Sequence, residues 1–579
     1  MTAYTFDQLI DFTRTSAATY VDASGRIVPT AASRNLLTFT QEFDNAAWVK
    51  TRASVSADQV AAPDGTLTAD KLIEDTTASN SHRVQRTITL TGASVTFSAY
   101  LKAAERTFAY LRMDDASTVK YVYVDLSTGA LGTVTSGVTG SVTSVGNGWY
   151  RVSMVFVAPA ATASGVVVVG SAASGSSDTY TGNGTSGIYL WGAQLEANAT
   201  ATDYTRNNGG VFPPRLDYDP VTLAPKGLLV EEQRTNLFTY SEQFDGPSWT
   251  PTNLTVTANS TTSPDGTVDA DTLNEGTATG VHSIAQVFSA TTGTSYALSV
   301  YLKNGDARYA QLFFGSAGHG STAFANFDLQ AGTVGTVGAA ATASIQPAGN
   351  GWYRCTIVAA ATATTASASA QIGVITSSTS ARAESYTGAS KFFYAWGIQT
   401  EAGSFATSYI PTVASQVTRT ADTLAITGAN FSQWYNQSEG TFVVEADVLS
   451  VANTNDSNLI ALYTGTFTAM RQWIWPGAPT TPRMTVLANG GSQAELVAAS
   501  GIAANATFKI ASAYKTNDFS ASFNGATPVT DTSGTVPTGF SQLNIGSYTG
   551  FIGFMSGHIR SVRYYPTRLS NAQLQALTA

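Results

Sequence analysis

The sequence is poor in cysteine, in charged residues and in long apolar runs. Its single cysteine, Cys355, excludes an intrachain disulfide, and the apolar strand pattern around it predicts a buried, inert thiol. Charged residues make up 12% of the chain and the formal net charge is −9, without clusters of Lys or Arg. Nucleic acids and anionic membranes both require positive charge to meet phosphate, so the sequence argues against both partners.

The sequence shows no targeting signal and no membrane-spanning run. Residues 1–11 have neither a basic n-region nor an apolar h-region, so we expect no signal peptide. Apolar runs such as 165–170 are far too short to cross a bilayer. We therefore expect synthesis in the cytoplasm, with release by lysis or as part of a particle if the protein acts outside a cell.

Aromatic and small residues are abundant instead. Aromatics make up 11% of the 579 residues, and the chain contains 51 glycines. Disordered chains have few aromatic and β-branched residues, so we expect a folded protein. The mixture favours short strands joined by turns of small residues, and the length suffices for three or four domains.

A repeat of about 200 residues is the strongest feature of the sequence. The offset is 201 between Trp48 and Trp249 and grows to 205 between Trp191 and Trp396, which fits small changes in loop length. The matching segments are 35–39 and 236–240, 63–66 and 264–267, 100–102 and 301–303, 146–151 and 349–354, and 191–197 and 396–402. So many landmarks in one order indicate a duplicated module.

Each copy has the sequence pattern of an antiparallel β-sandwich. Apolar residues alternate with polar ones over 95–101 and again over 296–302, which is the period of a half-buried strand. Asn147-Gly148 predicts a tight hairpin, because type I′ turns need positive φ at both central residues. No segment of the module sustains a helical period. We predict a jelly-roll sandwich for each copy. Trp149, Trp352, Trp191 and Trp396 fall within strand patterns, so we expect them in the core.

The parts outside the repeat have their own patterns. Residues 5–12 suggest a short helix, and 20–27 suggest an extended arm with a glycine turn. The prolines of 213–231 disfavour a helix, so we expect this connector to strap along a neighbour. Residues 413–579 do not match the repeat, and they end in a capping box at Ser570 and Gln573 with Leu569 placed to contact Leu574. This pattern predicts a terminal helix over 571–577.

Several segments resemble a known group of proteins. Segments 12–15, 217–220, 227–232 and 234–237 resemble head-spike and tail-fibre proteins of bacteriophages and gene transfer agents. The repeated Pro-Asp-Gly-Thr, Gly-Asn-Gly-Trp-Tyr-Arg and Trp-Gly-x-Gln-x-Glu motifs resemble carbohydrate-binding β-sandwich modules of such proteins. Residues 557–565 and 569–574 resemble a concanavalin A-like (laminin-G-like) module. The first sandwich interrupts the N-terminal strap of this group.

The resemblance implies an all-β chain: two repeated jelly-roll β-sandwiches, then a concanavalin A-like β-sandwich with a short C-terminal helix. The expected divisions are an arm for attachment or oligomerisation (1–34), sandwich 1 (35–206), a connector strap (207–235), sandwich 2 (236–412) and the last sandwich (413–579). It also implies a spike or fibre on a virion or virus-like particle. Such a protein attaches to host surface or capsular polysaccharide, contacts capsid or tail proteins, and forms a homo-oligomer.

Eight residues are candidates for contact with sugar. Sugar CH faces stack on aromatic rings, and sugar hydroxyls pair with polar side chains in shallow sites. Single aromatic segments outside the repeat suggest platforms in loops of the last module, and a His/Gln pair recurs in both copies. The candidates are Trp434, Tyr435, Trp473, Trp475, His82, Gln85, His282 and Gln286. For the aromatic residues the alternative is core packing, and for the histidine pairs it is hydrogen bonding to the backbone.

Six carboxylates are candidates for a structural Ca²⁺ site, the one cofactor that the sequence suggests. Jelly-roll modules often hold Ca²⁺ with oxygen ligands from turns such as Pro-Asp-Gly. The candidates are Asp64, Asp70, Glu196, Asp265, Asp271 and Glu401. The alternative for Asp64 and Asp265 is that they stabilise the turns as Asx residues without a metal.

The sequence favours a binding protein over an enzyme. The four histidines lack the spacing of a metalloprotease motif, and no GxSxG nucleophile motif occurs. Two functions from other classes remain open at this point. One is a structural decoration protein of a particle without glycan binding, and the other is a capsule-degrading enzyme, which needs a pair of opposed carboxylates.

Overall fold

The computed structural model describes residues 10–30, 35–90, 94–114, 118–157, 163–207, 209, 212–451, 456–464, 467–477, 480–550 and 552–579. Within these residues the chain is almost entirely β-structure, which confirms the predicted fold class. The described helices are short: α2 (Ser316–His319), α3 (Gly428–Ser432) and α4 (Asn571–Thr578). None of these helices has the length and apolarity that a membrane span requires.

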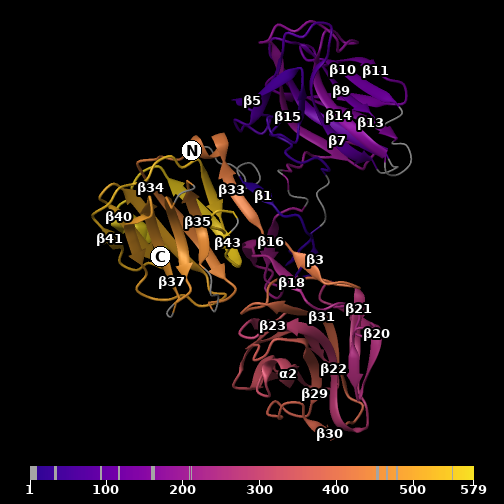
Figure 1. Cartoon of the computed structure of the whole chain (residues 1–579), viewed down its shortest axis with the longest axis vertical. Coiled ribbons are helices and arrows are strands. Elements are labelled where there is room, and N and C mark those ends of the chain that lie inside the picture. Colours follow the sequence, from indigo (N-terminus) through magenta and orange to yellow (C-terminus); the bar gives the residue numbers. More distant parts are fainter. Residues whose placement is uncertain are drawn as a thin grey trace.

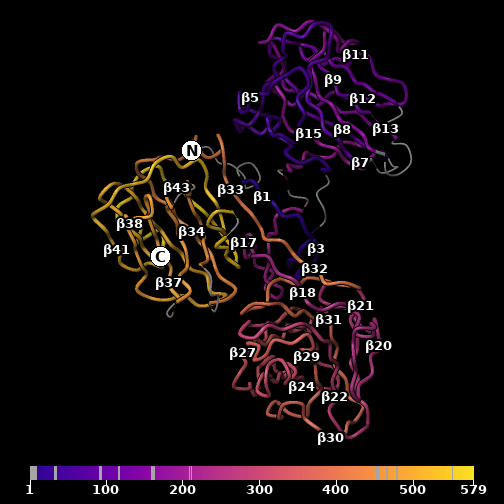
Figure 2. Tube along the Cα trace, viewed as in Figure 1, coloured from indigo at the N-terminus to yellow at the C-terminus, as the bar shows by residue number. Residues whose placement is uncertain are grey.

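Three sandwiches lie around a central region where segments from distant parts of the chain meet (Figure 1). The first sandwich is drawn in indigo and purple, the second in magenta to orange, and the third in orange to yellow. Figure 2 shows that β1, β3, β18 and β32 lie in the central region, between the sandwiches. These strands are β1 (Asp11–Thr13), β3 (Ile27–Pro29), β18 (Arg234–Asn236) and β32 (Val417–Arg419).

The first sandwich consists of two six-stranded antiparallel sheets. Their strand orders are β11-β10-β9-β14-β7-β4 and β12-β13-β8-β15-β6-β5. The strands are β4 (Val49–Thr51), β5 (Ala53–Val60), β6 (Ala69–Glu74), β7 (His82–Leu90), β8 (Ser94–Ala103), β9 (Phe108–Asp114), β10 (Val119–Asp125), β11 (Ala130–Val134), β12 (Thr139–Gly146), β13 (Trp149–Val157), β14 (Ala163–Ala172) and β15 (Gly187–Glu196). Phe43, Trp48 and Phe97 are fully buried between the sheets.

The second sandwich repeats this order strand for strand. Its sheets are β26-β25-β24-β29-β22-β19 and β27-β28-β23-β31-β21-β20, with β30 paired to β22 at the side. The strands are β19 (Thr250–Thr252), β20 (Leu254–Thr262), β21 (Val268–Glu275), β22 (Thr279–Ala290), β23 (Ser295–Asn304), β24 (Tyr309–Phe314), β25 (Phe324–Asp328), β26 (Thr333–Val337), β27 (Ala341–Pro347), β28 (Trp352–Ala360), β29 (Thr365–Ile375), β30 (Ser385–Thr387) and β31 (Phe392–Ala402). The duplicated sequence therefore folds into a duplicated topology.

The repeated Asn-Gly turn has the backbone that the sequence predicts. Asn147 and Gly148 have φ of 51° and 77°, and Asn350 and Gly351 have φ of 50° and 80°. Positive φ at both central residues is the requirement of a type I′ turn, and each turn joins two paired strands, β12 to β13 and β27 to β28.

The third sandwich takes strands from three separate parts of the chain. Its sheets are β1-β33-β42-β35-β36-β37-β38 and β16-β17-β43-β34-β39-β40-β41. The further strands are β16 (Arg215–Tyr218), β17 (Pro225–Val230), β33 (Thr423–Thr427), β34 (Glu439–Val448), β35 (Ser457–Tyr463), β36 (Ala469–Trp475), β37 (Thr481–Ala488), β38 (Gly491–Val497), β39 (Phe508–Lys515), β40 (Phe519–Phe523), β41 (Val529–Asp531), β42 (Gln542–Ile545) and β43 (Gly557–Tyr565). The connector thus straps along a neighbour as predicted, because β17 pairs with β43.

Both ends of the chain allow a comparison with the sequence patterns. The helix suggested over 5–12 is wrong at its C-terminal end, because residues 11–13 form strand β1 on β33; residues 5–9 lie outside the described residues. The arm turns at Gly25 between β2 (Thr19–Val21) and β3. The terminal helix is confirmed as α4, with the capping box of Ser570 and Gln573, and Leu569 packs in one cluster with Leu574.

A buried charge cluster joins the arm, the connector and the segment that enters the third sandwich. Its members are Arg14, Arg215, Glu231, Arg419 and Asp422, and all five side chains are fully buried. Asp422 receives hydrogen bonds from Arg14 and Arg215, and Glu231 receives them from Arg215, at 2.6 Å, and lies 2.8 Å from Arg419. Each charged group lies beside a group of opposite charge, and the attraction between them offsets the cost of removing both from water.

A second buried contact lies next to this cluster. His558 on β43 is hydrogen-bonded through Nε2 to Asp217 of β16 at 2.9 Å and through Nδ1 to Asp447 of β34 at 2.8 Å. Asp217 also accepts a hydrogen bond from the backbone of Val21 in the arm. One histidine therefore links the arm, the connector and the third sandwich.

Candidate functional site

The outer face of the third sandwich carries an unusual row of aromatic and arginine side chains. On β36, Met470 and Ile474 face the core, so Arg471, Trp473 and Trp475 alternate onto the opposite face. The register of the sheet places Arg483 of β37 directly beside Trp473. The sequence thus positions two tryptophans and two arginines on one face without any loop.

These side chains stack in an alternating series, which we call the aromatic–arginine ladder: Tyr548, Arg471, Trp473, Arg483 and Trp475. The Arg471 guanidinium lies 5.1 Å from the ring of Tyr548 and 3.9 Å from that of Trp473. The Arg483 guanidinium lies 5.7 Å from Trp473 and 4.5 Å from Trp475. Guanidinium groups at these distances are attracted to the faces of the rings, so the ladder holds itself in place.

The two tryptophans differ in their accessibility. Trp473 is 4% exposed, and its Nε1 donates to Thr485 Oγ1 at 2.8 Å, whereas Trp475 is 40% exposed. Gly477 lies against the indole edge of Trp475, where a Cβ would come within 2.0 Å of Nε1. Trp475 is therefore an open ring surface on a strand, buttressed from one side by Arg483.

Carboxylates balance the charge of the ladder. Arg471 pairs with Asp456 at 3.1 Å and reaches Asn458 Oδ1 at 3.4 Å, and Arg483 pairs with Glu495 at 2.5 Å. Two guanidinium groups thus face two carboxylates, so the face has many hydrogen-bonding groups and little net charge.

A hollow of about 380 Å³ adjoins the Arg471 end of the ladder. Its lining consists of Glu232, Asp456, Asn458, Arg471, Tyr548, Ile552, Gly553 and Phe554. Neither tryptophan lines this hollow, and the exposed Trp475 lies at the other end of the ladder. There the indole, with Arg483 and its partner Glu495 beside it, suits a ring-shaped ligand with one apolar face and several hydroxyl groups.

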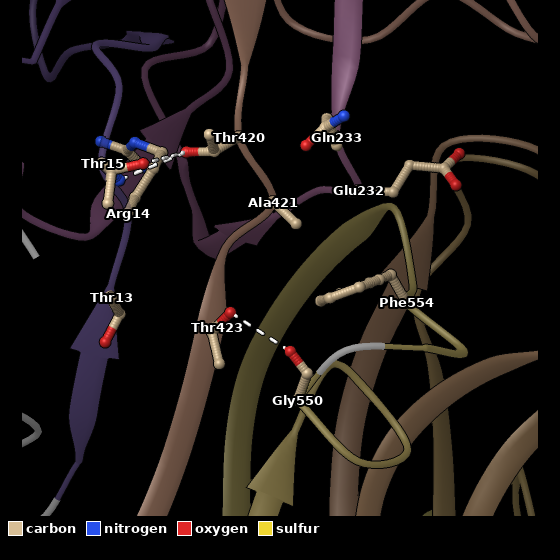
Figure 3. A pocket seen from close by; sticks show the side chains of 10 residues that line it. All are labelled: Thr13, Arg14, Thr15, Glu232, Gln233, Thr420, Ala421, Thr423, Gly550 and Phe554. Atoms are coloured by element: carbon tan, nitrogen blue, oxygen red, sulfur yellow. Dashed lines mark hydrogen bonds between the residues drawn. The ribbon is translucent and has the colours of Figure 1, made fainter.

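A second hollow of about 450 Å³ shares Glu232 and Phe554 with the first. Figure 3 shows Thr15 hydrogen-bonded to Thr420 on one side of it, and Phe554 on the other. Burial raises the pKa of Glu232 above its ordinary value. Arg14 of the buried charge cluster also lines this second hollow. The second hollow therefore lies between the candidate site and the centre of the molecule.

The structure brings two of the aromatic candidates together and separates the other two from them. Trp473 and Trp475 share the ladder, but the expectation that they lie in loops is wrong, because both belong to the paired strand β36. Trp434 and Tyr435 follow α3 and pack against the core of the third sandwich, where Tyr435 stacks on Phe431 at 4.6 Å. For these two residues the core-packing alternative holds.

The repeated histidines satisfy backbone groups. His82 and His282 are fully buried, and their Nδ1 atoms lie 2.7 Å from Arg52 O and 2.9 Å from Asn253 O. Full burial leaves neither ring a surface for sugar, so the alternative of backbone hydrogen bonding is the one that the structure supports.

The two glutamines differ. Gln286 is 5% exposed and exchanges hydrogen bonds with the backbone of Thr239, which commits it to a structural role. Gln85 is half-buried and accepts a hydrogen bond from Arg83 at 3.0 Å. The expectation that the glutamine recurs with the histidine is wrong, because the strand register makes Ala285 the counterpart of Gln85. Only Gln85 therefore lies where a ligand could reach it.

The six candidate metal ligands have partners within the protein. Asp64 and Asp265 accept backbone hydrogen bonds two residues on, from Thr66 and Thr267, which is the Asx-turn alternative. The other four are buried and accept hydrogen bonds from nearby groups: Asp70 from the backbone of Phe43 and Asp58, Asp271 from Phe244 and Asn259, Glu196 from Thr202, and Glu401 from Thr407. Among the described residues, no three acidic, histidine or cysteine side chains are grouped so that they could hold a metal ion.

The remaining expectations about buried residues are confirmed. Cys355 is fully buried, and burial raises the pKa of its thiol well above the ordinary value. Trp149, Trp352, Trp191 and Trp396 are all at most 4% exposed.

Arg471, Arg483 and Tyr548 are the site residues that the sequence patterns did not indicate. The sequence could have indicated Arg471, because it lies two residues before Trp473 on the same strand and so points to the same face of the sheet. Arg483 and Tyr548 come from later segments, and only the register of the sheet brings them beside the tryptophans.

A comparison with solved structures finds partial similarities to this chain. The CBM40 module of Ruminococcus gnavus IT-sialidase is 17% identical, with 25% of this chain and 84% of that chain covered and a TM-score of 0.22. The CBM22-1–CBM22-2 tandem of Paenibacillus barcinonensis Xyn10C is 13% identical, with 64% and 99% covered and a TM-score of 0.22. Domains LG4-5 of the mouse laminin α1 chain are 11% identical, with 50% and 90% covered and a TM-score of 0.19. No protein-family model and no curated protein matches the sequence.

Proposed function

We propose that this chain is a non-enzymatic glycan-binding protein and that its principal binding face is the aromatic–arginine ladder. The observation that carries the proposal is Trp475, an indole that stays 40% exposed although a paired strand and Arg483 hold it in place. An exposed tryptophan costs hydrophobic stabilisation, so a rigid, open indole beside hydrogen-bonding groups is best accounted for by a ligand that stacks on it.

Binding without catalysis fits the carboxylates of this face. Hydrolysis of a glycosidic bond needs one carboxylic acid and one carboxylate on opposite sides of the bond. Asp456 and Glu495 instead each form an ion pair with a different arginine of the ladder, so neither faces the other across a shared site.

The finer role in this proposal is host attachment. The segments at 12–15 and 227–232 that resemble spike and fibre proteins of phages and gene transfer agents support a place on a particle surface. There a homo-oligomer in contact with capsid or tail proteins would present several ladders to host polysaccharide, and several weak sites together give strong attachment.

The test is binding of the full chain to a printed array of neutral and acidic oligosaccharides. We expect wild type to bind a subset of the array and Trp475→Ala to weaken that binding by about tenfold or more, the scale of one lost stacking contact. Phe467→Ala is the matched control, because Phe467 is an exposed aromatic residue of the same sandwich outside the ladder. Equal losses in both variants, or no binding by wild type, would contradict the proposal.

A further inference from the structure

The first sandwich carries a cluster of aromatic residues outside its core. Tyr110, Tyr121 and Tyr123 lie on the face of sheet β11-β10-β9-β14-β7-β4 that points away from the other sheet. Tyr121 and Tyr123 stack with their ring centroids 5.3 Å apart and their planes 10° apart. Tyr110 and Tyr123 are buried with Val168 and Ala172 in a cluster separate from the core between the sheets, and Tyr121 keeps part of its surface exposed at the edge of this cluster.

Gly170 permits this arrangement. It pairs with Tyr110 in the sheet, and a Cβ at Gly170 would lie 2.6 Å from the ring of Tyr110. Tyr110 therefore lies flat across the glycine and supports the two tyrosines beside it, at 5.7 Å from Tyr121 and 5.8 Å from Tyr123. The result is a rigid aromatic base on a sheet.

Polar side chains continue the same face. One row across the sheet runs from Gln85 through Val168 and Arg112 to Tyr121. The Arg112 guanidinium lies 5.7 Å from the Tyr121 ring and donates to Asp114, with Nε 2.7 Å from Oδ1. Gln85, Arg112, Asp114 and Tyr121 all keep part of their surface exposed. We call these four residues, with Tyr110 and Tyr123 beneath them, the tyrosine face.

The second sandwich has different residues at the same positions. Gly373 corresponds to Gly170, and it identifies Gln311, Asn326 and Phe313 as the counterparts of Tyr110, Tyr123 and Arg112. Gln311 donates to Asn326 and to Ala381 O, and Asn326 donates to Ser380 O at 2.8 Å.

In the first sandwich the segment after β14 brings Asp178 beside the rings of Tyr110, Tyr121 and Tyr123, and Tyr121 still keeps part of its surface exposed. The segment that follows β29 closes the corresponding face of the second sandwich. Its Arg382 lies 5.1 Å from the ring of Phe313 and donates to Phe314 O at 2.7 Å. Phe313 is 2% exposed. The polar groups of this copy therefore serve the fold, and its apolar ring is covered.

From this difference we infer that the tyrosine face is a second glycan-binding site, which the second sandwich lacks. The ligand is an uncharged sugar ring, because Asp114 pairs with Arg112 and Asp178 adds a negative charge beside the tyrosine rings, which disfavours an acidic sugar. Tyr121 offers a ring surface for the sugar CH groups, and Gln85, Arg112 and Asp114 offer donors and acceptors for its hydroxyls. The inference rests on the proposed function and extends it from the third sandwich to the first. The second sandwich then serves as a spacer.

Native mass spectrometry of the full chain with the neutral oligosaccharide that gives the strongest array signal counts the ligands bound per chain. We expect two ligands on wild type, one on Tyr121→Ala, one on Trp475→Ala and none on the double variant. Arg112→Lys keeps the charge but loses the planar fork, and we expect it to behave as Tyr121→Ala does. Tyr309→Ala is the control on the second sandwich and keeps two ligands, because Tyr309 is a half-buried tyrosine of the corresponding sheet.

The outcomes separate this inference from the proposed function. One ligand on wild type, lost with Trp475→Ala and kept with Tyr121→Ala, overturns the inference and leaves the proposed function standing. One ligand lost only with Tyr121→Ala supports the tyrosine face and overturns the ladder as the principal site. Loss of a ligand with Tyr309→Ala overturns the asymmetry between the copies.

Discussion

Arg14 and Asp422 lie 408 positions apart in the sequence, yet Arg14 Nη1 donates to Asp422 Oδ1 at 2.7 Å and both side chains are fully buried. Arg14 also donates to Thr30 of the arm and to Pro213 O of the connector. The arm is therefore built into the centre of the molecule, although the sequence suggested an appendage for docking. Its role in attachment to a particle stays a prediction.

Loss of Asp422 should destabilise the whole centre. Asp422→Ala leaves Arg14 and Arg215 without their shared carboxylate in a site closed to water, which typically costs about 3–5 kcal/mol of unfolding free energy. Urea unfolding monitored by tryptophan fluorescence measures the effect. Glu495→Ala removes an exposed partner of Arg483 and should cost less than about 1 kcal/mol. Similar costs for the two variants would refute the role of the cluster.

Deleting residues 1–34 should loosen the junction as well as remove the arm. The deletion takes away strand β1 and Arg14, so β33 loses a neighbour and Asp422 loses one of its two arginines. We expect a lower unfolding temperature and faster proteolysis near residue 420 than in the full chain. An unchanged unfolding temperature would show that the modules fold independently of the arm.

His558 should make the junction sensitive to alkaline pH. Burial alone would lower the pKa of His558, but hydrogen bonds to Asp217 and Asp447 outweigh burial and raise it, against the nearby positive charge of Lys226. Arg560 also faces Asp447, at 3.7 Å. A raised pKa in the folded state means that the stabilisation is fully present below about pH 6.5 and is lost as pH rises through the folded-state value.

Chemical denaturation of wild type and His558→Asn from pH 5.5 to 9 tests this effect. We expect the stability difference between the two proteins to be largest at acidic pH and to shrink as pH rises. A difference that is constant over this range would contradict the ionic role of His558.

His319 should have the opposite pH dependence. Its ring stacks on Phe314 at 4.2 Å in the core of the second sandwich, and burial lowers its pKa to about 4. Because the pKa of His319 is lower in the folded state, its contribution to stability is present above about pH 6.5 and is lost as pH falls toward 4. The free energy of unfolding should fall by about 3 kcal/mol over this range. His319→Phe should remove this acid sensitivity in thermal unfolding between pH 7 and 4. An identical acid profile in wild type and variant would count against it.

The duplicated fold was predictable because its landmarks impose local constraints. Trp149 Nε1 donates to Ala61 O, and Trp352 Nε1 donates to Thr262 O at the same place in the repeat. The same hydrogen bond therefore fixes the tryptophan in both copies. The Asn-Gly turns likewise need positive φ, which few other residue pairs tolerate.

The buried charge cluster and the ladder were not predictable in the same way. The ion pair of Arg215 and Asp422 joins residues 207 positions apart, and nothing in either local sequence marks the other as its partner. The ladder depends on which residue of β37 lies beside Trp473, and pairing of strands sets that register. Accessibility also needs the full fold, because Trp473 and Trp475 are alike in sequence and differ in burial.

The most direct measurement of the central claim is a crystal structure of the full chain soaked with the oligosaccharide that gives the strongest array signal. Our account predicts density for a sugar ring stacked on the Trp475 indole, with its hydroxyls within hydrogen-bond distance of Arg483 or Glu495. A fully occupied sugar elsewhere on the molecule, with the Trp475 indole bare, would contradict the ladder as the principal glycan-binding face.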